Sequence, residues 1–106
     1  MNVKIFCSVL VSVFCALGVQ TAAAQTGTTL YAVTNCYVFE TSDGLTLFER
    51  SGGDGVKVGE KVVGTLDDYG YQSLKNSSGK EVLVGFVQDL GITDPKMVAE
   101  FKKNCR

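Results

Sequence analysis

Hydrophobic and polar residues alternate in short runs along most of this chain, and the runs end at residues that favour turns. The clearest series lies within residues 56–91. Its runs are 61–66, 71–75 and 81–87, and its turns are 67–70 and 76–80. Gly, Asn, Asp and Ser in the turns supply positive φ angles or local side-chain hydrogen bonds. Because β-branched and aromatic residues fill the runs, this series predicts a small antiparallel meander.

Two more alternating segments precede the meander. Residues 29–34 predict an opening strand, which 36–40 continues after a break at Asn35, and 45–50 predict another strand after a turn at 41–44. The glycine-rich residues 51–55 resemble one copy of a calcium-binding repeat. Such sites need stacked repeats, so a plain hairpin loop is expected. The polar residues 25–28 predict a flexible leader.

A helix is predicted over residues 93–105. Asp94 is a favourable N-cap, and Pro95 fits the first helical position because its missing N–H would have no partner there. Met97, Val98, Phe101 and Cys105 then fall on one face at helical spacing. We expect this apolar face to pack on the β-structure, although a helix that docks a partner is the alternative.

Residues 1–24 have the features of a cleaved signal peptide. Lys4 precedes an apolar run over 5–19, and three alanines at 22–24 offer the small residues that a signal peptidase requires. An uncleaved anchor is the rival interpretation, but about 15 apolar residues are short for a bilayer that needs about 20. The expectation is export to the periplasm or the exterior, without stable membrane insertion after cleavage.

Removal of residues 1–24 leaves two cysteines. Cys7 and Cys15 each follow a bulky Phe, unlike a lipoprotein cysteine, and both lie in the signal segment. Cys36 and Cys105 remain, and two cysteines in an exported chain most simply form one disulfide. This disulfide would close a loop of about 70 residues, and such a crosslink contributes on the order of 4 kcal/mol to the free energy of unfolding in the chain-entropy model. A catalytic or metal-binding thiol pair is disfavoured because the chain contains no histidine.

Charge and composition exclude several classes of function. After cleavage the net charge is 9 minus 11, or −2, and no basic stripe could neutralise phosphates, so nucleic acid is not expected as a partner. The absence of histidine removes Ser–His and Cys–His nucleophiles and the commonest metal ligand. No cofactor is expected. Glu40, Asp43 and Glu49 could gather near one loop, but no pattern predicts that they are buried.

Aromatic residues are frequent for so small a domain and favour binding. Phe39, Phe48 and Phe86 are predicted to lie in the core. For Tyr37, Tyr69 and Tyr71 the sequence leaves two alternatives open, which are a rim around the core and a ligand-contacting surface.

Residues 31–91 resemble the bacterial Src-homology-3 (SH3-like) family of extracytoplasmic domains. The resemblance rests on the glycine turn and apolar strand at 58–62, the glycine-aromatic strand at 68–74, and the final hairpin at 78–87. Tyr71 and Phe86 stand where that family usually has Trp. The segment 36–43 keeps only the strand character of the family's Asn-Val-Arg-Ser-Gly motif, with Glu40 near the position of the motif's Arg. The resemblance implies a mainly β fold, a small antiparallel barrel with a short C-terminal helix, spanning residues 29–106.

The same resemblance implies a non-catalytic binding module that recognises a cell-wall peptide or a protein partner. The candidate ligand-binding residues are Tyr37, Glu40, Asp43, Tyr69 and Tyr71. A structural or accessory subunit of an envelope or secretion assembly is the alternative. A small carboxylate-dependent hydrolase is a weaker one, because no histidine is present to assist.

Overall fold

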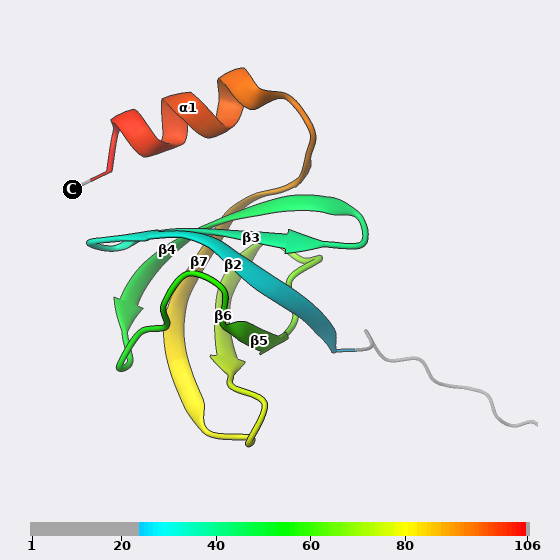
Figure 1. Cartoon of the computed structure of the whole chain (residues 1–106), viewed down its shortest axis with the longest axis vertical. Coiled ribbons are helices and arrows are strands. Elements are labelled where there is room, and N and C mark those ends of the chain that lie inside the picture. Colours follow the sequence, from blue (N-terminus) through cyan, green and yellow to red (C-terminus); the bar gives the residue numbers. More distant parts are fainter. Residues whose placement is uncertain (1–23, 106) are drawn as a thin grey trace, which may run out of the picture.

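The computed structural model describes residues 24–105, so the predicted signal peptide, apart from its last residue, and Arg106 lie outside the described part. The described chain forms six strands followed by one helix (Figure 1). The strands are β2 (Gln25–Val33), β3 (Cys36–Thr41), β4 (Gly44–Gly52), β5 (Lys61–Gly64), β6 (Gly70–Lys75) and β7 (Glu81–Ile92), and the helix is α1 (Pro95–Lys103).

The strands close into an antiparallel barrel in the order β2-β3-β4-β7-β6-β5. Pairing of Gln25–Thr28 with Lys61–Gly64 joins β2 to β5 and closes it. The fold class predicted from the sequence is therefore confirmed, and the architecture is consistent with a small SH3-like barrel. Residues 25–28, expected to be a flexible leader, instead begin β2, because backbone pairing with β5 does not require apolar side chains.

Two of the predicted connections differ from the structure. The chain reverses direction at Thr34 and Asn35, where Thr34 has a φ of 56°, so β3 pairs with β2 rather than continuing it. The loop after Gly52 is a crossover and not a hairpin, because β4 and β5 are not neighbours in the barrel. Gly55 N–H, which donates to the Val82 carbonyl at 2.8 Å, fastens this loop to β7.

The inside of the barrel holds the larger of two hydrophobic clusters. Phe39 and Phe48 are fully buried there, as predicted, with ring centroids 5.8 Å apart. The other buried members are Tyr37, Val62, Leu66, Leu74, Val82, Leu83 and Val87. Because side chains alternate across a strand, most neighbours of these residues on the strands point outward. Val82 and Leu83 are consecutive core residues, because Val82 lies at a register shift between β6 and β7.

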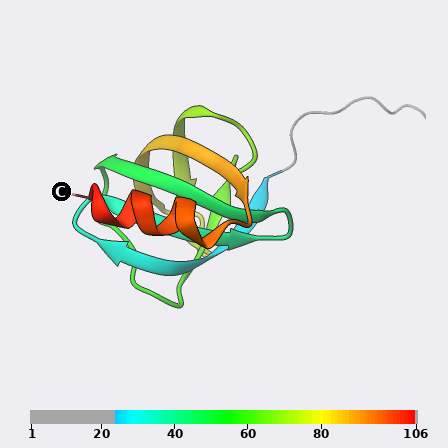
Figure 2. The same cartoon turned by 90° about the horizontal axis from the view of Figure 1, so that it is seen from above.

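A second hydrophobic cluster lies on the outside of the barrel, on strands that α1 covers. Figure 2 shows α1 lying across the barrel. Val38, Leu47 and Ile92 face outward and are buried because Val98 and Phe101 of the helix pack against them. The helix is shorter than the predicted range of 93–105 by two residues at each end. Its N-cap is Asp94, as predicted, with the carboxylate accepting a hydrogen bond from Lys96 N–H at 2.9 Å. The predicted packing of its apolar face on the β-structure is therefore confirmed for Val98 and Phe101.

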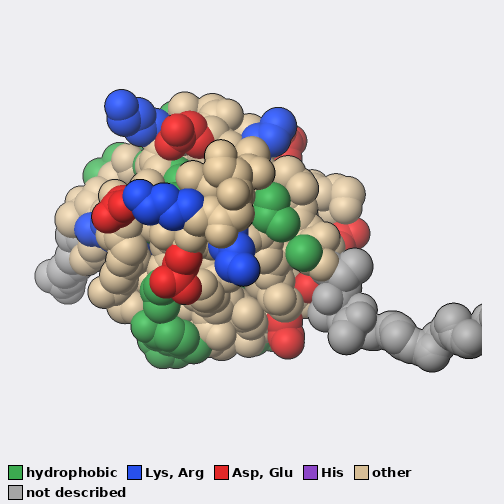
Figure 3. Space-filling view, turned by 90° about the horizontal axis from the view of Figure 1, so that it is seen from below, with side chains coloured by type: hydrophobic (Ala, Val, Ile, Leu, Met, Phe, Trp, Pro, Cys, Tyr) green, Lys and Arg blue, Asp and Glu red, His purple; other side chains and the backbone are tan. Residues whose placement is uncertain are grey.

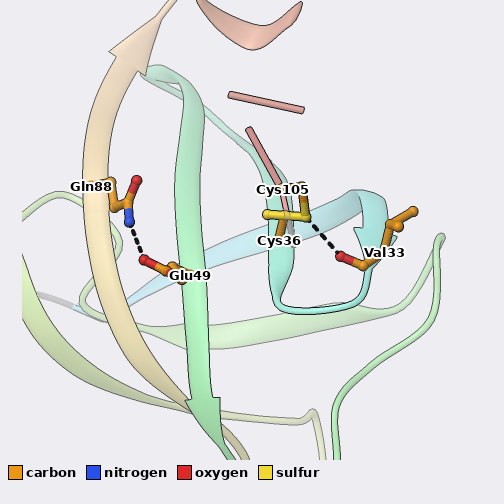
Figure 4. Close-up of a disulfide and its surroundings, with 5 residues drawn as sticks. All are labelled: Val33, Cys36, Glu49, Gln88 and Cys105. Carbon is orange, nitrogen blue, oxygen red and sulfur yellow. Dashed lines mark hydrogen bonds between the residues drawn. A yellow bond between two sulfur atoms is a disulfide. The ribbon is translucent and has the colours of Figure 1, made fainter. Parts of the chain in front are cut away.

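A disulfide between Cys36 and Cys105 fastens the end of this helix to the start of β3 (Figure 4). The two Cα atoms are 5.7 Å apart, and the bond spans 69 positions of sequence, as the cysteine count predicted. No residue of α1 is fully buried, so the crosslink is a major attachment of the helix to the barrel. Within the described residues, no helix combines the length and the hydrophobicity needed to cross a membrane.

Candidate functional site

Phe86 lies on the outside of the barrel, which corrects its prediction as a core residue. Its side chain is 48% exposed, whereas Val87 beside it is buried. The reason is the two-residue period of a strand: with Leu83 and Val87 directed into the core, the residue before Val87 must face outward.

Three exposed rings lie on or next to the paired strands β6 and β7 and are called here the aromatic patch, namely Tyr69, Tyr71 and Phe86. Tyr71 lies opposite Phe86 in the β6–β7 register, and their rings meet edge to face with centroids 4.8 Å apart. The Tyr71 hydroxyl lies 2.9 Å from the Ser51 hydroxyl of β4. The Tyr69 hydroxyl donates to Asp89 Oδ1 at 3.4 Å. The tyrosine hydroxyls are thus oriented by neighbours, while the rings remain in contact with solvent.

A groove of about 370 Å³ runs between α1 and the outer surfaces of β4 and β7, and is called here the α1 groove. Its lining residues are Cys36, Leu47, Glu49, Gln88, Asp89, Met97, Glu100, Phe101 and Asn104. The helix contributes one wall at the spacing i, i+3, i+4 and i+7 from Met97. This volume lies in the range of sites that bind small ligands or single side chains.

The α1 groove and the aromatic patch form one continuous surface along β7. Gln88 lies at a register shift between β4 and β7, so the usual alternation is interrupted there and both Gln88 and Asp89 line the groove. Glu49 is opposite Phe86 in the β4–β7 register, and Gln88 Nε2 donates a hydrogen bond to Glu49 Oε1 (Figure 4). This amide–carboxylate pair lies where the groove meets the patch.

The ionisable residues that line the α1 groove carry charge of one sign. Glu49, Asp89 and Glu100 are its ionisable residues other than the disulfide-bonded Cys36. Each accepts hydrogen bonds from neutral donors, with Asn104 Nδ2 donating to Glu100 at 3.4 Å. The ion pair found within residues 24–105 joins Lys80 to Asp54, on a different part of the molecule. The carboxylates of the groove therefore have no cationic partner among the described residues.

The structure brings together only two of the five ligand-binding residues that the sequence singled out. Tyr37 is buried in the core, where its ring stacks on Phe39 with centroids 5.9 Å apart, which makes it a core residue. Tyr69 and Tyr71 are 60% and 57% exposed and belong to the aromatic patch.

The two predicted acidic residues lie on another part of the barrel. Glu40 is opposite Thr28 and Leu45, and Asp43 is in the β3–β4 turn, where it accepts a hydrogen bond from Gln25 Nε2 at 3.0 Å. Glu49 pairs with Cys36 at the other end of β3, four register positions from the pair of Glu40 with Leu45. The three carboxylates therefore do not gather at one loop.

The remaining surface offers less for recognition. Seen from the side away from α1, charged side chains of both signs are interspersed and hydrophobic ones lie in small separate groups (Figure 3). A second groove, beside Asp54, Lys61 and Lys80, is lined largely by loop residues and contains an internal ion pair. Within residues 24–105, no three His, Cys, Asp or Glu side chains lie close enough together to hold a metal ion.

Comparison of the chain with models of protein families, with curated proteins and with solved structures gave no match.

Proposed function

We propose that this chain is a non-catalytic binding module, exported to the periplasm or the exterior, that recognises a peptide or protein partner through the aromatic patch and the α1 groove. The observation that supports the proposal most strongly is the position of Tyr71 and Phe86. Two packed aromatic rings on the outside of a barrel are costly to expose to water, and such rings are enriched where proteins bind one another.

A rigid support for this surface also favours a binding role. The aromatic patch stands on paired strands of a closed barrel, and the disulfide fixes the helical wall of the groove. A surface that is already ordered loses little conformational entropy when a partner binds. The chain contains no histidine, which is the most frequent general base in catalysis.

The proposal is tested by capture on the immobilised purified protein. Purified peptidoglycan and envelope extract are applied to the wild type, to the double variant Tyr71→Ala/Phe86→Ala, and to Leu30→Ala. Leu30 is a matched control because it is an exposed apolar residue, 45% accessible, on the distant strand β2. We expect the wild type and Leu30→Ala to retain the same ligand, and the double variant to lose it.

Each outcome has a definite meaning. Retention of the sugar-peptide polymer identifies a wall ligand, whereas one stoichiometric protein identifies a protein partner or an assembly. Equal retention by the wild type and the double variant would contradict the site. Turnover of a wall fragment, lost on changing Glu40 or Asp43, would replace the proposal with the hydrolase alternative.

A further inference from the structure

We propose that the partner of this surface is a basic, extended polypeptide segment. A Lys or Arg side chain of the segment enters the α1 groove between Glu49, Asp89 and Glu100, and a neighbouring apolar side chain covers Tyr71 and Phe86. This inference rests on the proposed function and adds the chemistry of the ligand.

The charge of the α1 groove carries the first step. Three carboxylates line it, and their hydrogen-bond donors are an amide of Gln88, a hydroxyl of Tyr69, an amide of Asn104 and a backbone N–H of Leu90. All of these donors are neutral. A cation placed among the carboxylates would therefore gain attraction without displacing an existing ion pair.

The apolar lining of the groove narrows the choice of cation. Leu47, Met97 and Phe101 line the same space as the carboxylates, and Met97 is 41% exposed. Lys and Arg carry their charge on a hydrocarbon stem that packs on such surfaces. A bare metal ion fits less well, because within residues 24–105 no three acidic side chains converge closely enough to ligate one.

The arrangement along β7 favours a polypeptide over a free amine. From Asp89 in the groove to Phe86 in the patch the strand advances three residues, or ~10 Å at its usual rise per residue. An extended segment can thus place a basic side chain in the groove and an apolar one on the rings within a few residues of each other. A small amine would leave Tyr71 and Phe86 uncovered.

The inference is tested by selection from a random peptide display library on the purified full chain. Three proteins are compared, which are the wild type, Glu49→Gln/Glu100→Gln and Glu81→Gln. The Gln substitutions keep the shape and remove the charge, and Glu81 is a matched exposed carboxylate that lines neither groove. We expect the wild type and Glu81→Gln to enrich peptides with Lys or Arg near an apolar residue.

A synthetic peptide from that selection then provides the affinities. Loss of both groove charges is expected to weaken its binding about five- to twenty-fold, and replacing its basic residue by Gln should have a similar effect. Binding should also weaken as salt concentration rises, because partly exposed charges are screened. Because this salt titration uses the wild-type protein, its result does not depend on whether any variant folds.

The outcomes separate this inference from the proposed function. Enriched peptides without basic residues, or basic peptides bound equally by Glu49→Gln/Glu100→Gln, would overturn the inference and leave a binding module in place. A dimer in sedimentation that Phe86→Ala dissociates would also overturn it, by assigning the surface to a second copy of the chain. No enrichment together with no captured ligand would overturn both proposals.

Discussion

Tyr71 and Phe86 pack edge to face on the outer surface of the barrel, on neighbouring strands, with their ring planes inclined at 78°. The contact shields part of each ring, yet both side chains remain about half exposed. Since the barrel interior is already filled by other residues, this pair adds surface for recognition more than it adds core.

Phe86→Ala should therefore be a mild change for stability. We expect it to lower the free energy of unfolding by about 1–2 kcal/mol, through lost partial burial and the lost ring contact. Phe48→Ala is the comparison, because Phe48 is fully buried and its loss should cost about 3–5 kcal/mol. Urea unfolding of both variants measures the difference, and equal costs would contradict the outward position of Phe86.

Much of the fold could be predicted from the sequence because its signals are local. Alternation marks the strands, and Asp94 and Pro95 mark the N-cap and the first residue of α1, as predicted. The disulfide followed from counting, because only Cys36 and Cys105 remain after the predicted cleavage. Each of these signals depends on neighbouring residues or on simple arithmetic.

The candidate site could not be predicted in the same way, because it depends on pairings between distant segments. The α1 groove needs β4 beside β7 and the helix laid across them, and neither contact leaves a local signal. Neighbouring residues of a strand face opposite sides, so only one of Phe86 and Val87 could face the core. Placing Val87 in the core would have predicted the outward position of Phe86. Tyr37 obeys the same rule, since it alternates with the outward-facing Cys36 and Val38.

Cys105→Ser should destabilise the protein and free α1 in particular. Loss of the crosslink is expected to lower the free energy of unfolding by about 4 kcal/mol, with the value dependent on the chain-entropy model. Without the bond, the helix is held chiefly by the partly buried Val98 and Phe101. Urea unfolding gives the free energy, and hydrogen exchange should show amides of α1 losing protection before those of β3 and β4.

The double variant Cys36→Ser/Cys105→Ser is the control, because it removes the bond without leaving a reactive thiol. It should reproduce the result for Cys105→Ser. Unchanged unfolding in both variants would mean that the disulfide does not stabilise the fold.

Two buried threonines should respond in opposite ways to the same substitution. Thr46 donates from its hydroxyl to the Leu66 carbonyl at 3.0 Å inside the protein. Thr46→Val leaves that carbonyl without its partner and should cost about 1–3 kcal/mol. Thr29 is equally buried, but its hydroxyl has no hydrogen-bond partner among the described residues. Thr29→Val should therefore be neutral or stabilising. Thermal unfolding of both variants measures the two changes in stability. Destabilisation of both variants would contradict the expected difference.

Close approach of β4 and β7 should make Gly85 difficult to replace. A Cβ atom at this position would overlap the backbone carbonyl oxygen of Glu49, which cannot move without disturbing the sheet. Gly85→Ala is expected to cost about 3 kcal/mol or more, as overpacking against backbone does. Gly52→Ala is the matched control on β4, because a Cβ there meets nothing within 4 Å and should change stability by less than about 1 kcal/mol.

Mapping of the bound surface by NMR tests whether this protein binds its partner through the aromatic patch and the α1 groove. Backbone amide resonances are followed while the captured ligand, or the selected peptide, is added to the wild-type protein. We expect the largest changes on residues 49–51, 69–71, 86–89 and 97–104. Changes concentrated instead on residues 54–61 and 76–82, around the second groove, would contradict it.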